Sequence, residues 1–142
     1  MGKKRIVKTE AQEGEGAVKA PVSSSKKKVE AGTLYVESTY NNTKLTLADT
    51  KGNTLGWSSS GSLGFKGAKK GTPFAAAKVG ELLAQKAQTI GIKKVDVIVK
   101  GVGSGRESSI RGFLTKGAIL GTIRDMTPVP HNGPKPKKPR RV

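Results

Sequence analysis

The feature that most constrains this chain is a run of β-branched residues that leads directly into a glycine-rich turn. Val95, Val97 and Val99 alternate along residues 95–100, a pattern that predicts a buried strand. Three glycines follow within residues 101–105, and apolar residues then recur at 110, 113 and 114 with helical spacing. We therefore expect a strand, a tight turn and a short helix in succession, with Ser104 as the N-cap of the helix and Gly117 at its C-terminal end.

This junction is a candidate anion site. Backbone N–H groups at the start of a helix lack partners within the helix and can bind phosphate, and Arg106 and Arg111 add positive charge there. The same residues also fit an ordinary tight turn, and both interpretations stay open. The glycine spacing matches neither the dinucleotide-binding motif nor the P-loop, so neither a nucleotide pocket nor a cofactor is predicted.

The segment before the junction alternates in the manner of β-strands. Apolar and polar residues alternate over 33–38 and again over 44–47, with a turn at 40–43, which predicts a hairpin. A second turn at 49–53, where Gly52 is free to take a positive φ, leads to a third strand over 54–60. These strands predict an antiparallel meander, and we expect its Trp57 to pack in the core rather than to stack on a base.

Helical signals flank the junction on both sides. Thr72 and Pro73 fit the N-cap and first position of a helix, whose apolar face repeats to residue 90 before Gly91 ends it. A last strand is expected over 118–124, so the second half of the chain reads as a parallel βαβ unit. The predicted fold class is α/β: a mixed five-stranded sheet, an antiparallel meander plus the parallel βαβ unit, packed by two helices.

The two ends differ from the middle. Residues 1–31 contain almost no large apolar groups and are predicted to form a disordered arm, with residues 26–28 either a solvated charge run or an arm that orders on phosphate. Residues 32–130 form the predicted α/β domain. Residues 131–142 continue a segment with five prolines from 128 onward, and we expect a disordered, extended basic tail.

Charge indicates the partner. The chain has a formal net charge of +17, and residues 32–130 alone contain fourteen Lys and Arg against six Asp and Glu. Such an excess favours a polyanionic partner, and nucleic acid is favoured over a membrane because the sequence contains no long apolar run. The chain has no cysteine, so we expect neither disulfides nor thiolate metal sites. It shows no hydrophobic signal segment, so we expect a cytoplasmic location.

The loop over residues 60–73 is long and rich in glycine and lysine. Lys66, Lys69 and Lys70 are interleaved with glycines, which predicts a flexible cationic segment able to follow a sugar-phosphate backbone. A simple disordered loop is the alternative.

Several short motifs, taken together and in order, resemble the family of small-subunit ribosomal protein S-eleven (S11). The resemblance covers roughly residues 32–142 and rests on the segments Tyr40-Asn41-Asn42-Thr43, Trp57-Ser58-Ser59-Ser60-Gly61, Gly64-Phe65-Lys66-Gly67, Thr72-Pro73-Phe74-Ala75-Ala76, the 99–107 glycine segment and Asp125-Met126-Thr127-Pro128 followed by Pro130-His131-Asn132-Gly133. The last of these resembles the bacterial and organellar branch.

The resemblance implies a ribonuclease-H-like sheet without enzymatic activity, in a protein on the platform of the small ribosomal subunit. Members of the family bridge small-subunit rRNA helices and line the cleft that holds the Shine–Dalgarno duplex of the mRNA. Ribosomal proteins S-seven, S-eighteen and S-six are the implied neighbours, and initiation factor three approaches the same platform. Two departures stand out: Val102 replaces a proline of the family, and Pro134-Lys135 replaces Cys-Arg.

With charge, turn chemistry and resemblance combined, we predict an RNA-binding set drawn from four segments. Its members are Asn41, Asn42, Thr43, Lys66, Lys69, Lys70, Gly103, Ser104, Gly105, Arg106, Arg111, His131, Asn132, Lys135, Lys137, Lys138, Arg140 and Arg141. His131, the only histidine, has neither a nucleophile nor a second metal ligand near it in sequence, so we expect it to contact backbone or phosphate.

Two rival classes deserve comparison. Ribonuclease-H-like sheets can hold two metals, but the acids of the domain are scattered and predict no convergent set, so neither an enzyme nor a metal site is expected; they are Glu37, Asp49, Glu81, Asp96, Glu107 and Asp125. A DNA-binding architectural protein fits the charge, yet the chain contains no helix-turn-helix or minor-groove wedge motif.

Overall fold

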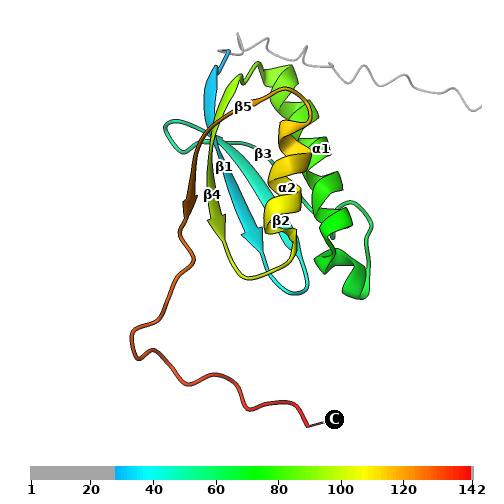
Figure 1. The fold of residues 1–142 in the computed structure, drawn as a ribbon, viewed down its shortest axis with the longest axis vertical. Coiled ribbons are helices and arrows are strands. Elements are labelled where there is room, and N and C mark those ends of the chain that lie inside the picture. The colour runs from blue at the N-terminus through cyan, green and yellow to red at the C-terminus, as the bar shows by residue number, and fades with distance from the viewer. Residues whose placement is uncertain (1–27, 142) are drawn as a thin grey trace, which may run out of the picture.

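A computed structural model describes residues 28–141 as one α/β domain followed by an extended segment (Figure 1). The predicted N-terminal arm therefore lies almost wholly outside the described residues. The elements are, in order, β1 (Ala31–Ser38), β2 (Thr43–Asp49), β3 (Thr54–Ser59), the 3₁₀ helix η1 (Gly67–Gly71), α1 (Pro73–Ile90), β4 (Lys94–Lys100), α2 (Gly105–Leu114) and β5 (Ile119–Asp125).

The sheet has the predicted mixed topology. Its strand order is β3-β2-β1-β4-β5, with β1–β2 and β2–β3 antiparallel and β1–β4 and β4–β5 parallel. The meander and the βαβ unit are both present, and the order is that of a ribonuclease-H-like sheet. Because β3 and β5 are the edge strands, the three inner strands β2, β1 and β4 form backbone hydrogen bonds with a neighbour on each side.

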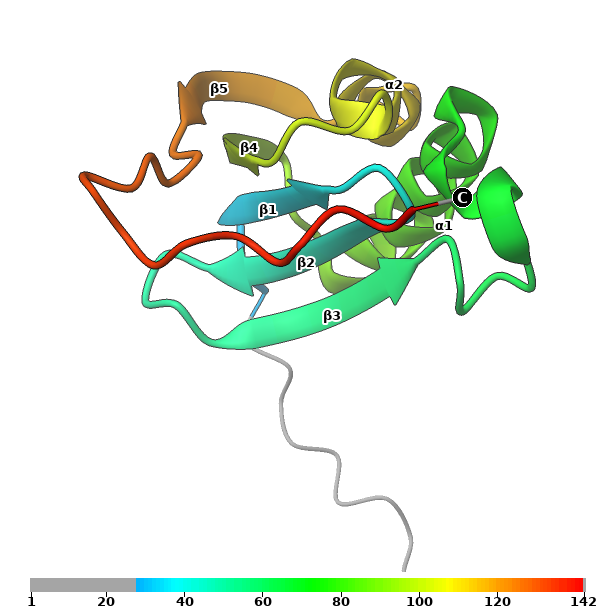
Figure 2. The same ribbon diagram turned by 90° about the horizontal axis from the view of Figure 1, so that it is seen from below.

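Both helices cover the same face of this sheet, and the other face is open (Figures 1 and 2). Alternate residues of β1, β2 and β4 supply the core beneath α1 and α2, as the period of two predicts: Leu34, Val36, Leu45, Leu47, Val95, Val97 and Val99. Val79 and Leu83 of α1 and Phe113 of α2 complete it, each fully buried. This apolar core is the frame on which the loops are mounted.

The caps of α1 were correctly predicted. The Thr72 hydroxyl accepts a hydrogen bond from the Ala75 backbone N–H, Pro73 is the first residue of the helix, and Gly91 ends it with φ +97°. The preceding loop is not wholly irregular, however. Its lysines lie in and beside η1, a single 3₁₀ turn that the glycine-rich composition did not suggest.

The two helices approach each other through glycine. A Cβ on Gly80 of α1 would lie 2.3 Å from the Ser109 carbonyl oxygen of α2, and one on Gly112 would lie 2.5 Å from the Ala77 carbonyl oxygen. The backbones are thus in direct contact at both positions. This contact fixes where α2 begins, and hence where the glycine turn before it lies.

Trp57 is not in the core, contrary to the prediction. Its neighbours Gly56 and Ser58 face α1, so Trp57 points from the opposite face of β3 and is 55% exposed. A single tryptophan usually packs inside, but here strand alternation determines the face, and glycine and serine occupy the inward positions.

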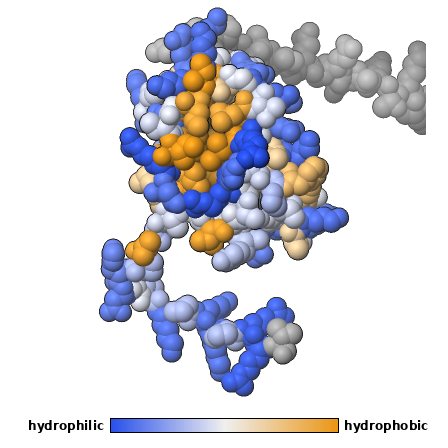
Figure 3. All heavy atoms as spheres, viewed as in Figure 1, coloured by the Kyte–Doolittle hydropathy of each residue, from blue (hydrophilic) through white to orange (hydrophobic). Residues whose placement is uncertain are grey.

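The outer strand β5 is exposed along its whole length. The side chains of Ile119 and Ile123 are more than half exposed, and Leu120 is about one-third exposed. Figure 3 shows an apolar patch over this part of the molecule, bordered by hydrophilic residues. An exposed apolar edge strand presents unpaired backbone groups together with side chains that favour burial.

Residues 126–141 contain neither helix nor strand and lead away from the domain, as the proline content predicts (Figure 1). The backbone Met126 N–H still bonds the Val99 carbonyl, after which the chain leaves the sheet. Asn132 takes a left-handed conformation at φ +55° within this segment.

We predict that Gly80→Ala lowers the free energy of unfolding by about 1–3 kcal/mol, because the added methyl group clashes with backbone rather than with a mobile side chain. Thermal or urea unfolding measures the effect. The matched control is Gly56→Ala, where a Cβ meets only side-chain carbons at 3.6 and 3.7 Å. Equal stability of the two variants would contradict a rigid contact between the helices.

Candidate nucleic-acid interface

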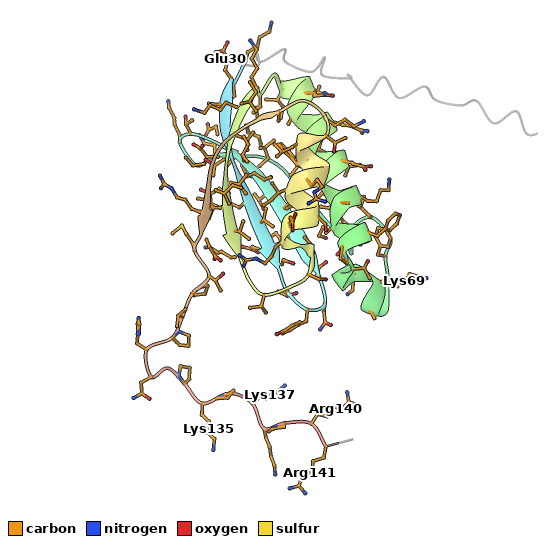
Figure 4. The ribbon with its side chains drawn as sticks, viewed as in Figure 1. Glu30, Lys69, Lys135, Lys137, Arg140 and Arg141 are labelled. Carbon is orange, nitrogen blue, oxygen red and sulfur yellow. The ribbon has the colours of Figure 1, made fainter. Side chains whose placement is uncertain are left out.

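Three of the predicted segments, far apart in sequence, meet at one end of the sheet. They are the β1–β2 turn at residues 39–42, the loop over residues 60–72 that contains η1, and the glycine turn at residues 101–105 (Figure 1). We call this end the loop end. In Figure 4 the labelled Lys69 and the cations of the tail lie toward it, whereas Glu30 lies at the opposite end.

The glycine turn is pressed against the end of β1. The Gly103 N–H donates to the Ser38 carbonyl at 2.9 Å. A Cβ on Gly101 would lie 2.1 Å from the Ser38 carbonyl oxygen, and one on Gly103 would lie 2.3 Å from the Thr39 carbonyl oxygen. Gly101 also has φ +101°. The glycines are therefore needed for close backbone approach, and Gly103 is buried rather than available to a ligand.

The Ser60 hydroxyl ties the second segment to the first. Its oxygen accepts from the Thr43 N–H at 3.2 Å, and the hydroxyl donates to the Lys70 carbonyl at 2.8 Å. It also lies 2.6 Å from the side-chain amide oxygen of Asn42. Thr43 and Ser60 are completely buried. Sequence reasoning placed Thr43 among RNA contacts, whereas its side chain supports the loop end from inside.

The Ser104 side chain joins the second and third segments. It was predicted to cap α2, but it makes no cap hydrogen bond and instead donates to the Gly71 carbonyl at 2.8 Å. Ser104 has helical dihedral angles, which point its side chain away from the first free N–H groups of α2. Gly71 in turn touches the first segment, since a Cβ there would lie 2.2 Å from the Tyr40 carbonyl oxygen.

Arg106 is held within the protein. Its guanidinium donates to Asp125 at 2.6 Å and to the Gly101 carbonyl, and it lies 3.4 Å from the Thr127 hydroxyl. It thereby connects the glycine turn with the end of β5. Hydrogen bonds from the Thr127 hydroxyl, followed by that from Arg106, hold the pKa of the Asp125 carboxyl well below its usual range.

The remaining cations of the loop end face solvent. Lys66 and Lys69 are exposed and Lys70 is half-buried, and within the described residues none of the three has an acidic partner. Arg111, in the last turn of α2 beyond the loop end, is exposed, and within the described residues it pairs with Glu107, one helical turn away. Such a surface pair is weak, so Arg111 can exchange its partner for a phosphate at little cost.

The predicted residues thus fall into three groups. Asn41, Lys66, Lys69 and Ser104 are exposed at the loop end, with Asn42, Lys70 and Arg106 partly exposed there. Thr43, Gly103 and Gly105 are buried and serve as support, and Arg111 is exposed farther along, in the last turn of α2. Tyr40, which is not in the predicted set, is 80% exposed next to Asn41.

The tail presents its charges separately. Every residue of 131–141 is exposed, which includes His131, Asn132, Lys135, Lys137, Lys138, Arg140 and Arg141. Figure 4 shows the labelled Lys135, Lys137, Arg140 and Arg141 along a chain that stands clear of the domain. The loop end and the tail are therefore two cationic surfaces of different character, one rigid and one extended.

Two further aspartates in the described part of the chain are engaged in local structure. The Asn53 side-chain amide and nearby backbone N–H groups lower the pKa of Asp49 in its turn, and the Thr122 N–H and hydroxyl lower that of Asp96. Over residues 28–141, no group of three or more His, Asp or Glu is placed to hold a metal. No described helix is both long and apolar enough to cross a membrane.

Comparison with known proteins agrees with this geometry. The family model for "Ribosomal protein S11" matches residues 32–141. The chain belongs to this family. Relatives named small ribosomal subunit protein uS11 include one from Treponema pallidum (strain Nichols), 55% identical over 117 residues covering 82% of this chain and 93% of the relative. Another, from Solibacter usitatus (strain Ellin6076), is 48% identical over 133 residues, covering 87% and 98%.

Membership confirms the resemblance read from the sequence motifs. The chain is a structural, non-enzymatic constituent of the small ribosomal subunit, with rRNA and other ribosomal proteins as its partners. The scattered acids of the sheet are consistent with that assignment. Which of its surfaces meets which partner is a separate question.

We predict that stability falls as the pH drops below about 4. The folded state holds the Asp125 carboxyl at a lowered pKa, so its stabilisation is present above the unfolded value of 3.8 and is lost as the pH falls through the folded pKa. Asp125→Asn should lower the melting temperature at pH 7 and flatten the acid dependence. Glu37→Gln, at an exposed carboxylate, is the control, and an unchanged acid profile in Asp125→Asn would refute the assignment.

Proposed function

We propose that this protein holds together segments of small-subunit rRNA that are distant in the RNA sequence. In this proposal the loop end docks on one RNA surface through Asn41, Lys66 and Lys69, and Arg111 of α2 adds a contact beyond it. The observation that carries the proposal is the convergence of three separate segments on one rigid end, with the lysines left free of acidic partners within the described chain. Cations fixed in this way neutralise phosphates without a large loss of backbone entropy on binding.

The tail supplies the second point of attachment. Eleven residues, 131–141, extended at about 3.3 Å each can reach roughly 35 Å from the domain. Its five cations are therefore able to contact RNA well beyond the footprint of the folded part. Lysine and arginine on an extended chain follow a phosphate backbone without reading base sequence. Reach and charge together favour bridging over binding at one site.

The finer setting is also part of the proposal. We assign the protein to the platform of the small subunit, where it helps to form the cleft for the Shine–Dalgarno duplex of the mRNA. In this assignment ribosomal proteins S-seven, S-eighteen and S-six are its neighbours, and initiation factor three binds nearby. The exposed apolar edge of β5 is the described surface best suited to a neighbouring ribosomal protein. Crosslinking from Ile119 or Ile123 in assembled subunits tests this assignment.

Sedimentation of a lysate through sucrose gradients tests the central claim. Co-migration with small subunits and whole ribosomes that survives high salt is expected of an integral component. Recovery at the top of the gradient, or together with chromosomal DNA, would instead favour a free nucleic-acid binder.

Binding to a small-subunit rRNA transcript is predicted to weaken steeply with salt. About eight neutralised phosphates give a log–log slope on the order of −6 to −7. Removal of residues 131–142 should make this slope shallower by about 3.5 to 4.5, since five cations are lost and each contact contributes roughly 0.7 to 0.9. Filter binding over a salt series measures both values. An unchanged slope in the truncated chain would show that the tail makes no phosphate contact.

Two arginines are predicted to separate binding from folding. Arg111→Ala should weaken rRNA binding about three- to tenfold with little change in melting temperature, because its ionic partner within the described residues is an exposed glutamate. Arg106→Ala should lower the melting temperature, because it removes the contacts to Asp125 and the Gly101 carbonyl. Thermal unfolding and filter binding on the same preparations compare them. Identical behaviour of the two variants would contradict this division.

A further inference from the structure

Trp57 stands on the open face of the sheet, on the side away from both helices. The register places it in a row that crosses all five strands: Trp57, Thr46, Tyr35, Ile98 and Arg124. Two aromatic rings thus lie two strand spacings apart, roughly 10 Å, on one surface. Such an exposed indole on a strand is unusual, because burial of this ring is ordinarily favourable.

The surroundings of Trp57 are polar and cationic. The indole borders an open pocket of about 370 Å³, whose other walls are Lys44, Thr46 and Thr54. Elsewhere on the open face, strand alternation places Lys94 and Lys100 on β4. The face also carries Glu37 and Asp96, and the Asp96 carboxylate is occupied by Thr122. Cations therefore outnumber the free carboxylates.

We propose that this face, which we call the tryptophan face, binds an unpaired nucleotide of RNA, with its base stacked on Trp57 and a neighbouring phosphate held by Lys44. The proposal rests on the proposed function and adds to it a second type of contact, made to a base rather than to a backbone alone. Aromatic rings on an open β-sheet are a known means of holding unstacked bases. Thr46 and Thr54 provide hydroxyl groups at the rim for the base edge or sugar.

The composition of this face favours RNA over a protein occupant. The centres of protein interfaces are depleted in charge and rich in apolar area. Around Trp57 the lining is lysine and threonine, whereas the apolar patch of this protein lies on β5 at the other edge of the sheet. A basic, polar rim around one aromatic ring matches a base attached to its phosphate. Stacking also tolerates any base, so this contact requires an unpaired position rather than a sequence.

The chain offers a direct probe, because Trp57 is its only tryptophan. The full-length protein is titrated with a small-subunit rRNA transcript, and separately with a twelve-nucleotide oligoadenylate and a duplex of the same length. We expect the transcript and the single strand to quench the tryptophan fluorescence and to shield it from acrylamide, and the duplex to do neither. Shielding that arises only in complete subunits, and not with RNA alone, would indicate a protein occupant and overturn the proposal.

Matched variants give the second readout. Trp57→Leu should weaken transcript binding about tenfold, whereas Trp57→Phe, which keeps an aromatic ring, should stay within about threefold of the parent. Lys44→Gln should weaken binding more than Lys51→Gln, which removes the same charge from the β2–β3 turn. Melting temperatures show whether the variants are folded. The fluorescence titration uses only the parent protein, so its result does not depend on the variants.

The outcomes separate the two proposals. Full transcript affinity with Trp57 as accessible as in the free protein, or equal affinity of the leucine and phenylalanine variants, overturns the tryptophan face and leaves the bridging role intact. Failure of the parent protein to bind the transcript at all would overturn the bridging role, and the tryptophan face with it.

Discussion

The loop end depends on a backbone contact into which no side chain fits. Gly101 and Gly103 lie against the carbonyls of Ser38 and Thr39, so the segment after β4 is locked to the end of β1, its parallel neighbour. The position of α2 follows from this contact, and Gly80 and Gly112 secure the same helix against α1. Rigid placement of a cationic surface here comes from glycines in close contact with main-chain atoms, together with the Ser60 and Ser104 hydroxyls that bond main-chain carbonyls.

Three aspartates of the described residues serve this frame, which leaves most of the cations there without an acidic partner. Asp49 holds a turn, Asp96 accepts hydrogen bonds from Thr122 on β5, and Asp125 accepts from Arg106, which also bonds the Gly101 carbonyl of the glycine turn. In the described residues the ion pairs involve only three cations, Lys78, Arg106 and Arg111. Of these, only Arg106 pairs with a residue of a different element, Asp125 of β5. A strongly basic protein that used its acids to neutralise the loop lysines would lose the field that attracts RNA.

The sequence predicted the frame well and the surface less well, for physical reasons. Strand alternation, the Thr72 and Gly91 caps and the βαβ order are local signals, and each was confirmed. The convergence of the three loops is tertiary, so no local pattern could reveal that Ser104 bonds Gly71 instead of capping its own helix. The prediction for Trp57 was wrong because the scarcity of aromatic residues in the chain was given more weight than the alternation of side chains along the strand. The small residues on either side, Gly56 and Ser58, indicated that the inward positions were already occupied. Of the arm predicted over residues 1–31, residues 1–27 lie outside the described residues, and Ala31 already belongs to β1.

The two kinds of interaction respond differently to salt, and this difference explains how one small domain can serve both as a frame and as an RNA ligand. The core and the glycine contacts consist of apolar burial and neutral hydrogen bonds, which salt screens little. The RNA contacts proposed for the loop end and tail are phosphate interactions, which salt weakens steeply. Ionic strength can therefore release the protein from an isolated rRNA transcript without unfolding it, because the charges that bind are not the charges that hold the fold.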